Sequence, residues 1–196
     1  RKLITSSNRQ VKYSQLVVST GVTTDYSLFG GLKEDTYGLS NLNDVLRIKK
    51  LLNSINHSSN FAKPLVIAGA GPTGVELACK LSDLVNNRVE IFLIDKGNQI
   101  LSKSKSFNRE KAIDAINKRN IKMYLEYSIK SINEDFLELS NVEEERKNPL
   151  KLNYSSLLWT ARLMPCRLQL VDNLLDKNKK IKVNEFLQIH EYQNIF

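Results

Sequence analysis

The stretch that decides the fold is PLVIAGAGPTGVELACKL, residues 64–81. Its first half predicts a buried strand over residues 65–68, and the helical spacing of its later apolar residues predicts a helix. Between the two, Gly69, Gly71 and Gly74 form G-x-G-x-x-G. Gly69 allows the tight turn, Gly71 lets the backbone approach a pyrophosphate, and Gly74 permits close packing of helix on strand. The stretch therefore predicts a dinucleotide-binding turn.

The start of the predicted helix carries three further candidates. Pro72 needs no hydrogen-bonded amide at that position, and Pro72 and Thr73 lie where the exposed N–H groups of a helix bind an anion. Glu76 follows in the first turns, close to the path of a bound dinucleotide. Two alternatives stay open: the glycines form a strand-to-helix turn without a ligand, and Glu76 only offsets the helix dipole.

A second predicted strand strengthens the interpretation of the glycine motif as a dinucleotide-binding turn. VEIFLID, residues 89–95, ends in Asp95, which is 21 residues beyond Gly74. An acidic side chain at this spacing can accept both ribose hydroxyls. The carboxylate would repel a 2′-phosphate, so we expect NADH to be favoured over NADPH, although Lys96 beside it softens that preference. The alternative is an acid that merely ends the strand.

The rest of the chain alternates short apolar runs with helical patterns, as in α/β proteins. From Asn41 a helix is predicted, with apolar positions Leu42, Val45, Leu46 and Leu52 on one face and Asp44 in its first turn. The other predicted elements are a buried strand at 13–20 closed by Gly21, a helix at 107–119 capped by Asn108, a meander of strands at 122–125, 128–132 and 136–139, a strand at 156–160, and a hairpin-like pair at 181–183 and 186–189.

Composition argues against several classes of protein. The chain has 196 residues, 41% of them hydrophobic, and a net charge of +8 spread along its length, which is typical of a soluble globular protein rather than of a nucleic-acid binder with a clustered basic face. Cys79 and Cys166 form no CxxC, so we expect two small packing residues, a reducing compartment and no metal site. No apolar run is long enough to span a bilayer.

Four segments resemble the two-dinucleotide-fold flavoproteins, and among them the type II NADH:quinone dehydrogenases. LVVSTG, residues 16–21, is similar to a strand that ends in Thr-Gly against FAD, and residues 31–52 are similar to the family's connector. GAGPTGVELA, residues 69–78, matches the NADH-binding turn, and residues 183–196 resemble the segment before the second flavin signature. The resemblance covers nearly the whole chain.

The resemblance implies that NADH docks on the middle fold, passes a hydride to FAD, and the reduced flavin passes electrons to a quinone. It implies that Glu76 lies near nicotinamide and flavin as the catalytic residue, and that Thr20, Gly21 and Ala161 contact cofactor. It also implies a protein bound peripherally to the cytoplasmic side of a membrane through segments absent here, with the oligomeric state open and a homodimer among the options.

Several departures accompany the resemblance. The family's first G-x-G-x-x-G would lie before Arg1 and its closing Gly-Asp after Phe196. After Trp159-Thr160-Ala161, Arg162 replaces the glycine that the family usually has. That guanidinium either reaches a phosphate or blocks the site. We therefore expect the chain to bind NADH weakly, to hold FAD poorly and not to oxidise NADH by itself.

We expect an α/β protein with a three-layer Rossmann-like parallel sheet, an antiparallel meander and part of a second, FAD-type fold. The expected division is a partial FAD-domain segment at 1–30, connector at 31–60, NADH-binding domain at 61–150 and FAD-domain return segment at 151–196. Two alternatives to the quinone reductase remain: the same fold with a disulfide, sulfide or ferredoxin-type acceptor, and a dinucleotide-binding module without catalysis.

Overall fold

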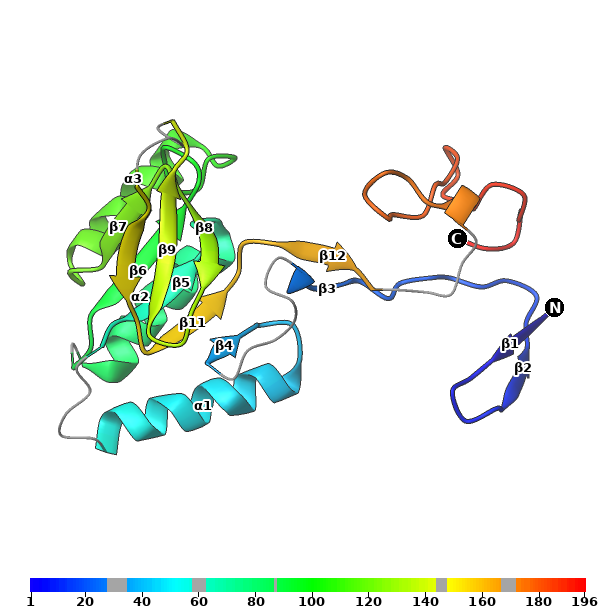
Figure 1. The fold of residues 1–196 in the computed structure, drawn as a ribbon. Coiled ribbons are helices and arrows are strands. Elements are labelled where there is room, and N and C mark those ends of the chain that lie inside the picture. Colours follow the sequence, from blue (N-terminus) through cyan, green and yellow to red (C-terminus); the bar gives the residue numbers. More distant parts are fainter. Residues whose placement is uncertain (28–34, 58–62, 87, 144–147, 167–171) are drawn as a thin grey trace. The chain divides into compact units, whose positions relative to one another are not determined.

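A computed structural model describes residues 1–27, 35–57, 63–86, 88–143, 148–166 and 172–196. The chain forms two units, which we call the larger unit, Thr24–Leu163, and the smaller unit, Arg1–Thr23 with Met164–Phe196 (Figure 1). Each is described by itself. The expected domain boundaries at 30/31 and 60/61 fall outside the described residues, so that division stays a prediction.

The larger unit is built on a parallel sheet of five strands in the order β4-β11-β5-β6-β7. The strands are β4 (Thr36–Tyr37), β5 (Leu65–Ala68), β6 (Ile91–Asp95), β7 (Lys122–Leu125) and β11 (Ser156–Trp159). Three helices accompany them: α1 (Leu42–His57), α2 (Pro72–Val85) and α3 (Ser106–Asn117). The order β5-α2-β6-α3-β7 is the doubly wound pattern that the glycine motif predicts.

The sheet is covered on both faces, which makes three layers (Figure 1). Leu65 and Ile67 of β5 pack with residues of α1, α2 and α3, whereas Val66 and Ala68 pack on the opposite face. This alternation follows from the two-residue period of a strand. All four residues are at most 3% exposed, as expected for a parallel strand buried between two layers.

An antiparallel meander forms the third layer. It consists of β8 (Tyr127–Ile132), β9 (Phe136–Asn141) and β10 (Leu150–Asn153). Its side chains Ile132, Leu137, Leu139 and Leu152 share a core cluster with Val66 and Phe92 of the sheet. The fold class predicted from the sequence is therefore confirmed.

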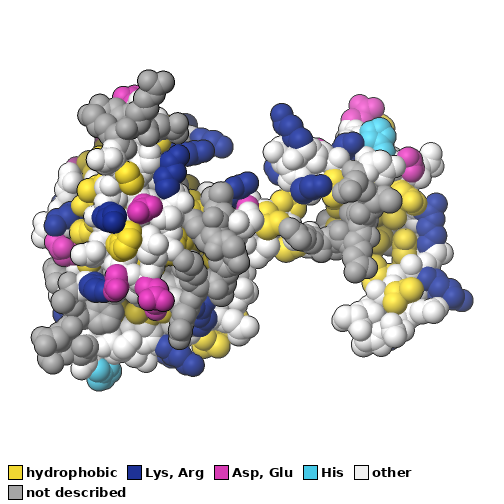
Figure 2. Space-filling view, in the orientation of Figure 1, with side chains coloured by type: hydrophobic (Ala, Val, Ile, Leu, Met, Phe, Trp, Pro, Cys, Tyr) yellow, Lys and Arg dark blue, Asp and Glu magenta, His cyan; other side chains and the backbone are white. Residues whose placement is uncertain are grey.

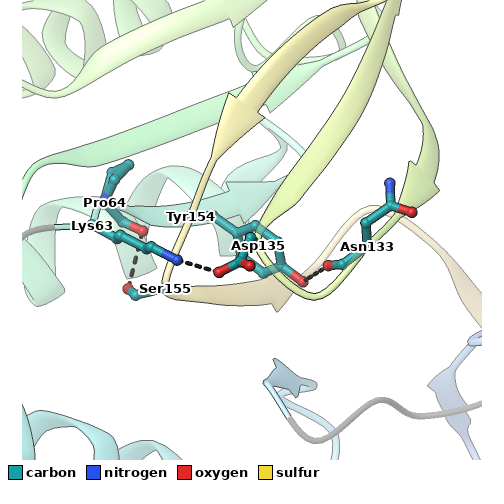
Figure 3. A network of polar contacts seen from close by, with 6 residues as sticks. All are labelled: Lys63, Pro64, Asn133, Asp135, Tyr154 and Ser155. Carbon is teal, nitrogen blue, oxygen red and sulfur yellow. Dashed lines mark hydrogen bonds and ion pairs between the residues drawn. The ribbon is translucent and has the colours of Figure 1, made fainter.

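A polar network ties the meander to the start of β5 (Figure 3). Tyr154 Oη donates a hydrogen bond to the carbonyl of Asn133 at 2.8 Å, and Ser155 N donates to the carbonyl of Pro64 at 2.9 Å. Lys63 forms an ion pair with Asp135. Burial raises the pKa of the Tyr154 phenol, and the carboxylates of Asp35 and Asp135 raise it further, so Tyr154 remains a donor at neutral pH. The network joins three turns at the amino end of β5.

The predictions for the strand at 122–125 and for the N-cap of α3 are wrong. The strand at 122–125 was expected in the meander, but β7 pairs in parallel with β6 and belongs to the main sheet. A run of four residues does not identify its partner, because pairing is set by the helix that brings it back to the sheet edge. Helix α3 begins at Ser106 with Lys105 as N-cap, so Asn108 lies inside it. Asn120, shortly after the end of α3, adopts a left-handed conformation with φ +52°.

Helix α1 is where predicted, but a different face is buried. Ile48, Leu51 and Ile55 pack into the core, whereas Leu42, Val45 and Leu46 are between 48% and 71% exposed. The helix has two apolar stripes, and periodicity cannot tell which one meets the neighbouring elements. In α2, the apolar side chains of Val75, Ala78, Leu81 and Val85 are buried, whereas Leu84 is exposed.

The smaller unit has little regular structure. It contains a hairpin of β1 (Lys2–Ile4) and β2 (Gln10–Lys12) and a short 3₁₀ helix at Asp172–Leu174. A further pair of short strands, β3 (Val22–Thr24) with β12 (Leu163–Pro165), contains the two chain positions at which the larger unit begins and ends.

The predicted buried strand at 13–20 does not form in the smaller unit. Leu16 makes a single parallel bridge to Ile195, supported by Leu16 N donating to the Asn194 carbonyl at 3.0 Å, and Val17 is 70% exposed. The segment at 181–189 similarly makes isolated bridges but no strands.

The face of the molecule shown in Figure 2 agrees with a net charge that is spread along the chain. On the face shown in Figure 2, lysine and arginine side chains are spread over both units, with acidic side chains among them in the larger unit. Within the residues that the structure describes, no helix has the length and apolarity needed to cross a membrane.

Candidate functional site

The carboxyl ends of three adjacent parallel strands, β5, β6 and β11, open into a cavity of about 370 Å³. Ligands of doubly wound folds bind at this edge. The lining residues come from these strand ends, from the residues after them and from β8: Ala68, Gly69, Ile94, Asp95, Lys96, Tyr127, Ser128, Ile129, Trp159, Ala161 and Arg162.

The glycine turn connects β5 to α2, and Gly69 is its residue that lines the cavity, whereas residues 71–74 do not line it. Gly69 has φ +105°, a conformation that disfavours any side chain, and a Cβ there would lie 2.8 Å from the Cα of Ala161. A Cβ on Gly74 would lie 1.7 Å from the carbonyl oxygen of Gly69, so helix and strand could not approach as they do. These two glycines meet steric requirements of the turn.

Gly71 differs from the other two glycines. A Cβ built on it would meet no atom within 4 Å, and Gly71 is the N-cap residue of α2 with Pro72 following it. Gly71, Pro72 and Thr73 are all exposed. The turn itself does not require a glycine at 71, but a ligand approaching the helix N-terminus would, because its phosphate needs the backbone at close range.

Asp95 ends β6 and braces the turn. Its Oδ2 accepts a hydrogen bond from Ala70 N at 2.7 Å, and its Oδ1 accepts one from Gly97 N at 2.7 Å. A carboxylate has about four acceptor positions, so two remain for ligand hydroxyls. Asp95 therefore holds the glycine turn in shape and lines the cavity at the same time.

The end of β11 lies against the glycine turn. Thr160 Oγ1 donates to the carbonyl of Ala68 at 2.9 Å and lies 3.2 Å from that of Gly69, which ties β11 to the end of β5. Ala161 lines the cavity, as expected of a predicted cofactor contact, but its binding role stays a prediction.

Arg162 is held at the cavity by Asp25. Arg162 Nε lies 2.9 Å from Oδ2 of Asp25, whose side chain is only 7% exposed, and the Asp25 amide donates to the carbonyl of Arg162 at 3.0 Å. The other oxygen, Oδ1, accepts from Ser27 N at 3.0 Å. The Arg162 side chain is 54% exposed and lines the cavity, so it is paired with Asp25 and still reachable from solvent.

The predicted residues Glu76, Thr20 and Gly21 do not line this cavity either. Glu76 is exposed on α2 and does not line it. Thr20 and Gly21 belong to the smaller unit; Gly21 has φ +70° and open space around its Cβ position. The catalytic and cofactor roles of these residues stay predictions.

Sequence reasoning missed the contribution of β8 and of Asp25. Tyr127, Ser128 and Ile129 line the cavity from the meander, and no motif marks them. Asp25 lies 137 positions from Arg162, and only the folded chain brings the two together.

Both cysteines are free, as predicted. Cys79 packs against the core cluster between the helices and the sheet. Burial raises the pKa of its thiol, which favours the unreactive protonated form. In the described part of the chain, no cluster of three or more His, Cys, Asp and Glu side chains could hold a metal ion.

Comparisons with known proteins place these features in a family. The chain is 30% identical over 187 residues to demethylphylloquinone reductase NdbB of Synechocystis sp., covering 94% of this chain and 45% of that protein. It is 20% identical to the type II NADH:quinone oxidoreductase Ndh of Mycobacterium tuberculosis, covering 95% of this chain and 45% of that protein. The chain thus spans less than half the length of these relatives.

Solved structures show the same fold. The structure of NDH2 from Plasmodium falciparum in complex with NADH matches with a TM-score of 0.83 at 22% identity, over 100% of this chain and 45% of that one. The sulfide:quinone oxidoreductase of Aquifex aeolicus matches with a TM-score of 0.77 at 17% identity, over 100% of this chain and 48% of that one. The family model for pyridine nucleotide-disulphide oxidoreductases matches residues 1–196, so the chain belongs to that family.

Proposed function

We propose that this chain is the NADH-binding portion of a flavin-dependent NADH dehydrogenase that passes a hydride from NADH to FAD and then electrons to a quinone. The observation that carries the proposal is the cavity at the carboxyl edge of the sheet, where Gly69 and Asp95 meet. The names of the relatives, a demethylphylloquinone reductase and a type II NADH:quinone oxidoreductase, support the nicotinamide donor and the quinone acceptor.

The residues of the larger unit fit the dinucleotide. The open backbone at Gly71 and the start of α2 at Pro72 and Thr73 would receive the diphosphate. Asp95 would accept hydrogen bonds from the ribose hydroxyls through the acceptor positions that the amides of Ala70 and Gly97 leave available. The carboxylate of Asp95 would repel the 2′-phosphate of NADPH. We therefore propose NADH as the preferred donor.

For FAD, the smaller unit offers Thr20 and Gly21. Thr20 is exposed, and the open space around Gly21 lets a flat ring approach the backbone. The flavin, when bound, accepts the hydride from NADH and supplies electrons to the acceptor. Glu76 is proposed to orient the donor from the exposed face of α2. We also propose that the protein lies peripherally on the cytoplasmic side of a membrane, through segments outside this chain.

One alternative to quinone as the electron acceptor is supported by a relative of this chain. A ferredoxin--NADP reductase of Rickettsia rickettsii is 29% identical over 157 residues, covering 79% of this chain and 42% of that protein. A ferredoxin-type acceptor would use the same cavity for its dinucleotide, so the two functions differ in the acceptor and not in the site described here.

The first test is a calorimetric titration of the 196-residue chain with NADH and NADPH, each with and without FAD. We expect NADH to bind, NADPH to bind more weakly, FAD to bind poorly, and no NADH oxidation by the chain alone. Absence of NADH binding would refute the proposed site. A purified chain that is yellow and reduces a soluble quinone would contradict the expectation for flavin.

A variant localises the binding. Gly71→Glu places a side chain and a negative charge against the diphosphate, and we expect it to reduce NADH affinity by about 100-fold or more. The variant should fold, because nothing lies within 4 Å of the new Cβ. Leu84→Glu, which places the same charged side chain at an exposed position of α2 that does not line the cavity, is the control. Unchanged NADH affinity in a folded Gly71→Glu chain would exclude this turn.

Asp95→Ala combined with a basic neighbour tests the coenzyme preference. Loss of the carboxylate removes the repulsion of a 2′-phosphate, so the ratio of NADH to NADPH affinity should fall. Titration with both coenzymes measures that ratio, and the same ratio in variant and wild type would contradict the ribose role of Asp95.

A further inference from the structure

Arg162 stands where the family usually has glycine, and its position beside the glycine turn is fixed by two contacts. Its neighbour Ala161 packs against Gly69, and its Nε lies 2.9 Å from Oδ2 of the buried Asp25. An arginine carries five N–H donors, of which Nε supplies one. The ion pair with Asp25 therefore ties the guanidinium through Nε, while the Arg162 side chain as a whole is 54% exposed and lines the cavity.

The charges around the cavity favour an anionic ligand. The lining residues carry two cations, Lys96 and Arg162, and one anion, Asp95. Asp95 already accepts hydrogen bonds from two backbone amides, which offset part of its charge locally. Lys96 follows Asp95 at the ribose side, and Arg162 lies on the opposite flank of β5, because β11 and β6 are the two neighbours of that strand.

We propose that Arg162 is a phosphate-binding residue of this chain, contacting the diphosphate of the bound dinucleotide through its terminal amino groups, and that Asp25 is its positioning residue. The inference rests on the proposed function, since it assigns a contact within the same site. It decides between the two roles that the sequence leaves open for Arg162, because a guanidinium tied to Asp25 is held at the cavity wall. Guanidinium groups match phosphate oxygens in geometry as well as charge.

The test compares two probes, ADP-ribose, which contains the diphosphate, and adenosine, which contains no phosphate. The affinities of the intact 196-residue chain are measured by calorimetry for ADP-ribose and by NMR titration for adenosine. Arg162→Ala should weaken ADP-ribose binding by about tenfold or more and change adenosine binding by less than about twofold. Arg162→Lys should give an intermediate loss, because a point charge replaces the planar fork.

The chain offers a matched control. Arg119 forms the same kind of ion pair, with Nε 2.8 Å from Oδ1 of Asp83, but does not line the cavity. Arg119→Ala removes an equal charge from the larger unit and should leave the affinity for ADP-ribose unchanged. An equal loss in Arg119→Ala and Arg162→Ala would mean that only net charge matters, and would overturn the assignment.

Asp25 is tested through its dependence on Arg162. Asp25→Asn should weaken ADP-ribose binding by about threefold, because the guanidinium loses its orienting charge, but should have no further effect in the Arg162→Ala background. Equal losses of ADP-ribose and adenosine binding in Asp25→Asn would indicate a structural role only. Thermal unfolding of each variant shows whether it folds.

The outcomes separate this inference from the proposed function. If wild type and Arg162→Ala bind ADP-ribose equally well, the phosphate contact of Arg162 is refuted, whereas the dinucleotide site itself is still supported. Tighter binding by Arg162→Ala would show that the side chain obstructs the cavity. Wild type that binds neither NADH nor ADP-ribose overturns the proposed function and this inference together.

Discussion

The two units of this chain differ in how completely they bury their apolar side chains. The larger unit buries both faces of its parallel sheet, and strand β5 is at most 3% exposed along its whole length. Among the described residues of the smaller unit, Leu174 and Ile189 are the hydrophobic side chains that are buried. Its Val17, Phe186 and Leu187 are each at least 67% exposed.

This difference teaches where stability and binding reside. Burial of apolar surface contributes about 25 cal/mol per Å², so the layers of the larger unit supply most of the hydrophobic stabilisation of the chain. The cavity is formed by strand ends that this core fixes in place. Trp159, the single tryptophan, is buried at the end of β11, so its fluorescence reports on the larger unit alone.

The largest effect on stability is expected from a core truncation. Leu93 is fully buried in β6, and Leu93→Ala should lower the free energy of unfolding by about 2–5 kcal/mol through lost burial and the cavity left behind. Urea unfolding followed by Trp159 fluorescence measures it. Val17→Ala, in the smaller unit, should stay within about 0.5 kcal/mol. Similar values for the two variants would break the comparison between the units.

Glycine substitutions sharpen the same comparison. Gly74→Ala places a Cβ 1.7 Å from the carbonyl oxygen of Gly69, so α2 must move away from β5, and we expect a loss of about 1–3 kcal/mol together with weaker NADH binding. Gly21→Ala has free space and suffers only from its positive φ, a penalty of about 1–2 kcal/mol confined to the smaller unit. The Trp159 transition should therefore shift for Gly74→Ala and stay in place for Gly21→Ala.

The smallest effect concerns an exposed carboxylate in each unit. The hydrogen bond from Arg119 holds the pKa of Asp83 below its usual value, and the backbone amide of Lys180 does the same for the pKa of Asp176 in the smaller unit. A carboxylate with a lowered native pKa stabilises the fold above its unfolded pKa, and this contribution is lost as the pH falls through the native value.

We therefore expect Asp83→Asn to lower the Tm reported by Trp159 slightly at pH 7, with the difference from wild type vanishing in strong acid. Asp176→Asn should leave that Tm unchanged at either pH. A shift of the Trp159 transition by Asp176→Asn would show that the two units unfold together.

Local sequence signals predicted the parts of the fold that local sterics control. The turn at Gly69, the helix after it and the strand ending in Asp95 all occur as expected. Partner choice was less predictable: β7 joined the main sheet, and α1 buried Ile48 rather than Val45. Such choices depend on which surface each element meets, and that surface is made by residues distant in the sequence.

By itself, then, the sequence determined the three-layer α/β class, the dinucleotide turn and the acidic residue at the end of β6, because each depends on residue types at short, fixed spacing. Only the tertiary structure decided that Asp95 braces Ala70 and Gly97, that residues of β8 close the cavity, and that Asp25 holds Arg162 beside the glycine turn. These contacts join segments up to 137 positions apart. A local sequence pattern cannot predict them, because such residues become neighbours only when the chain folds.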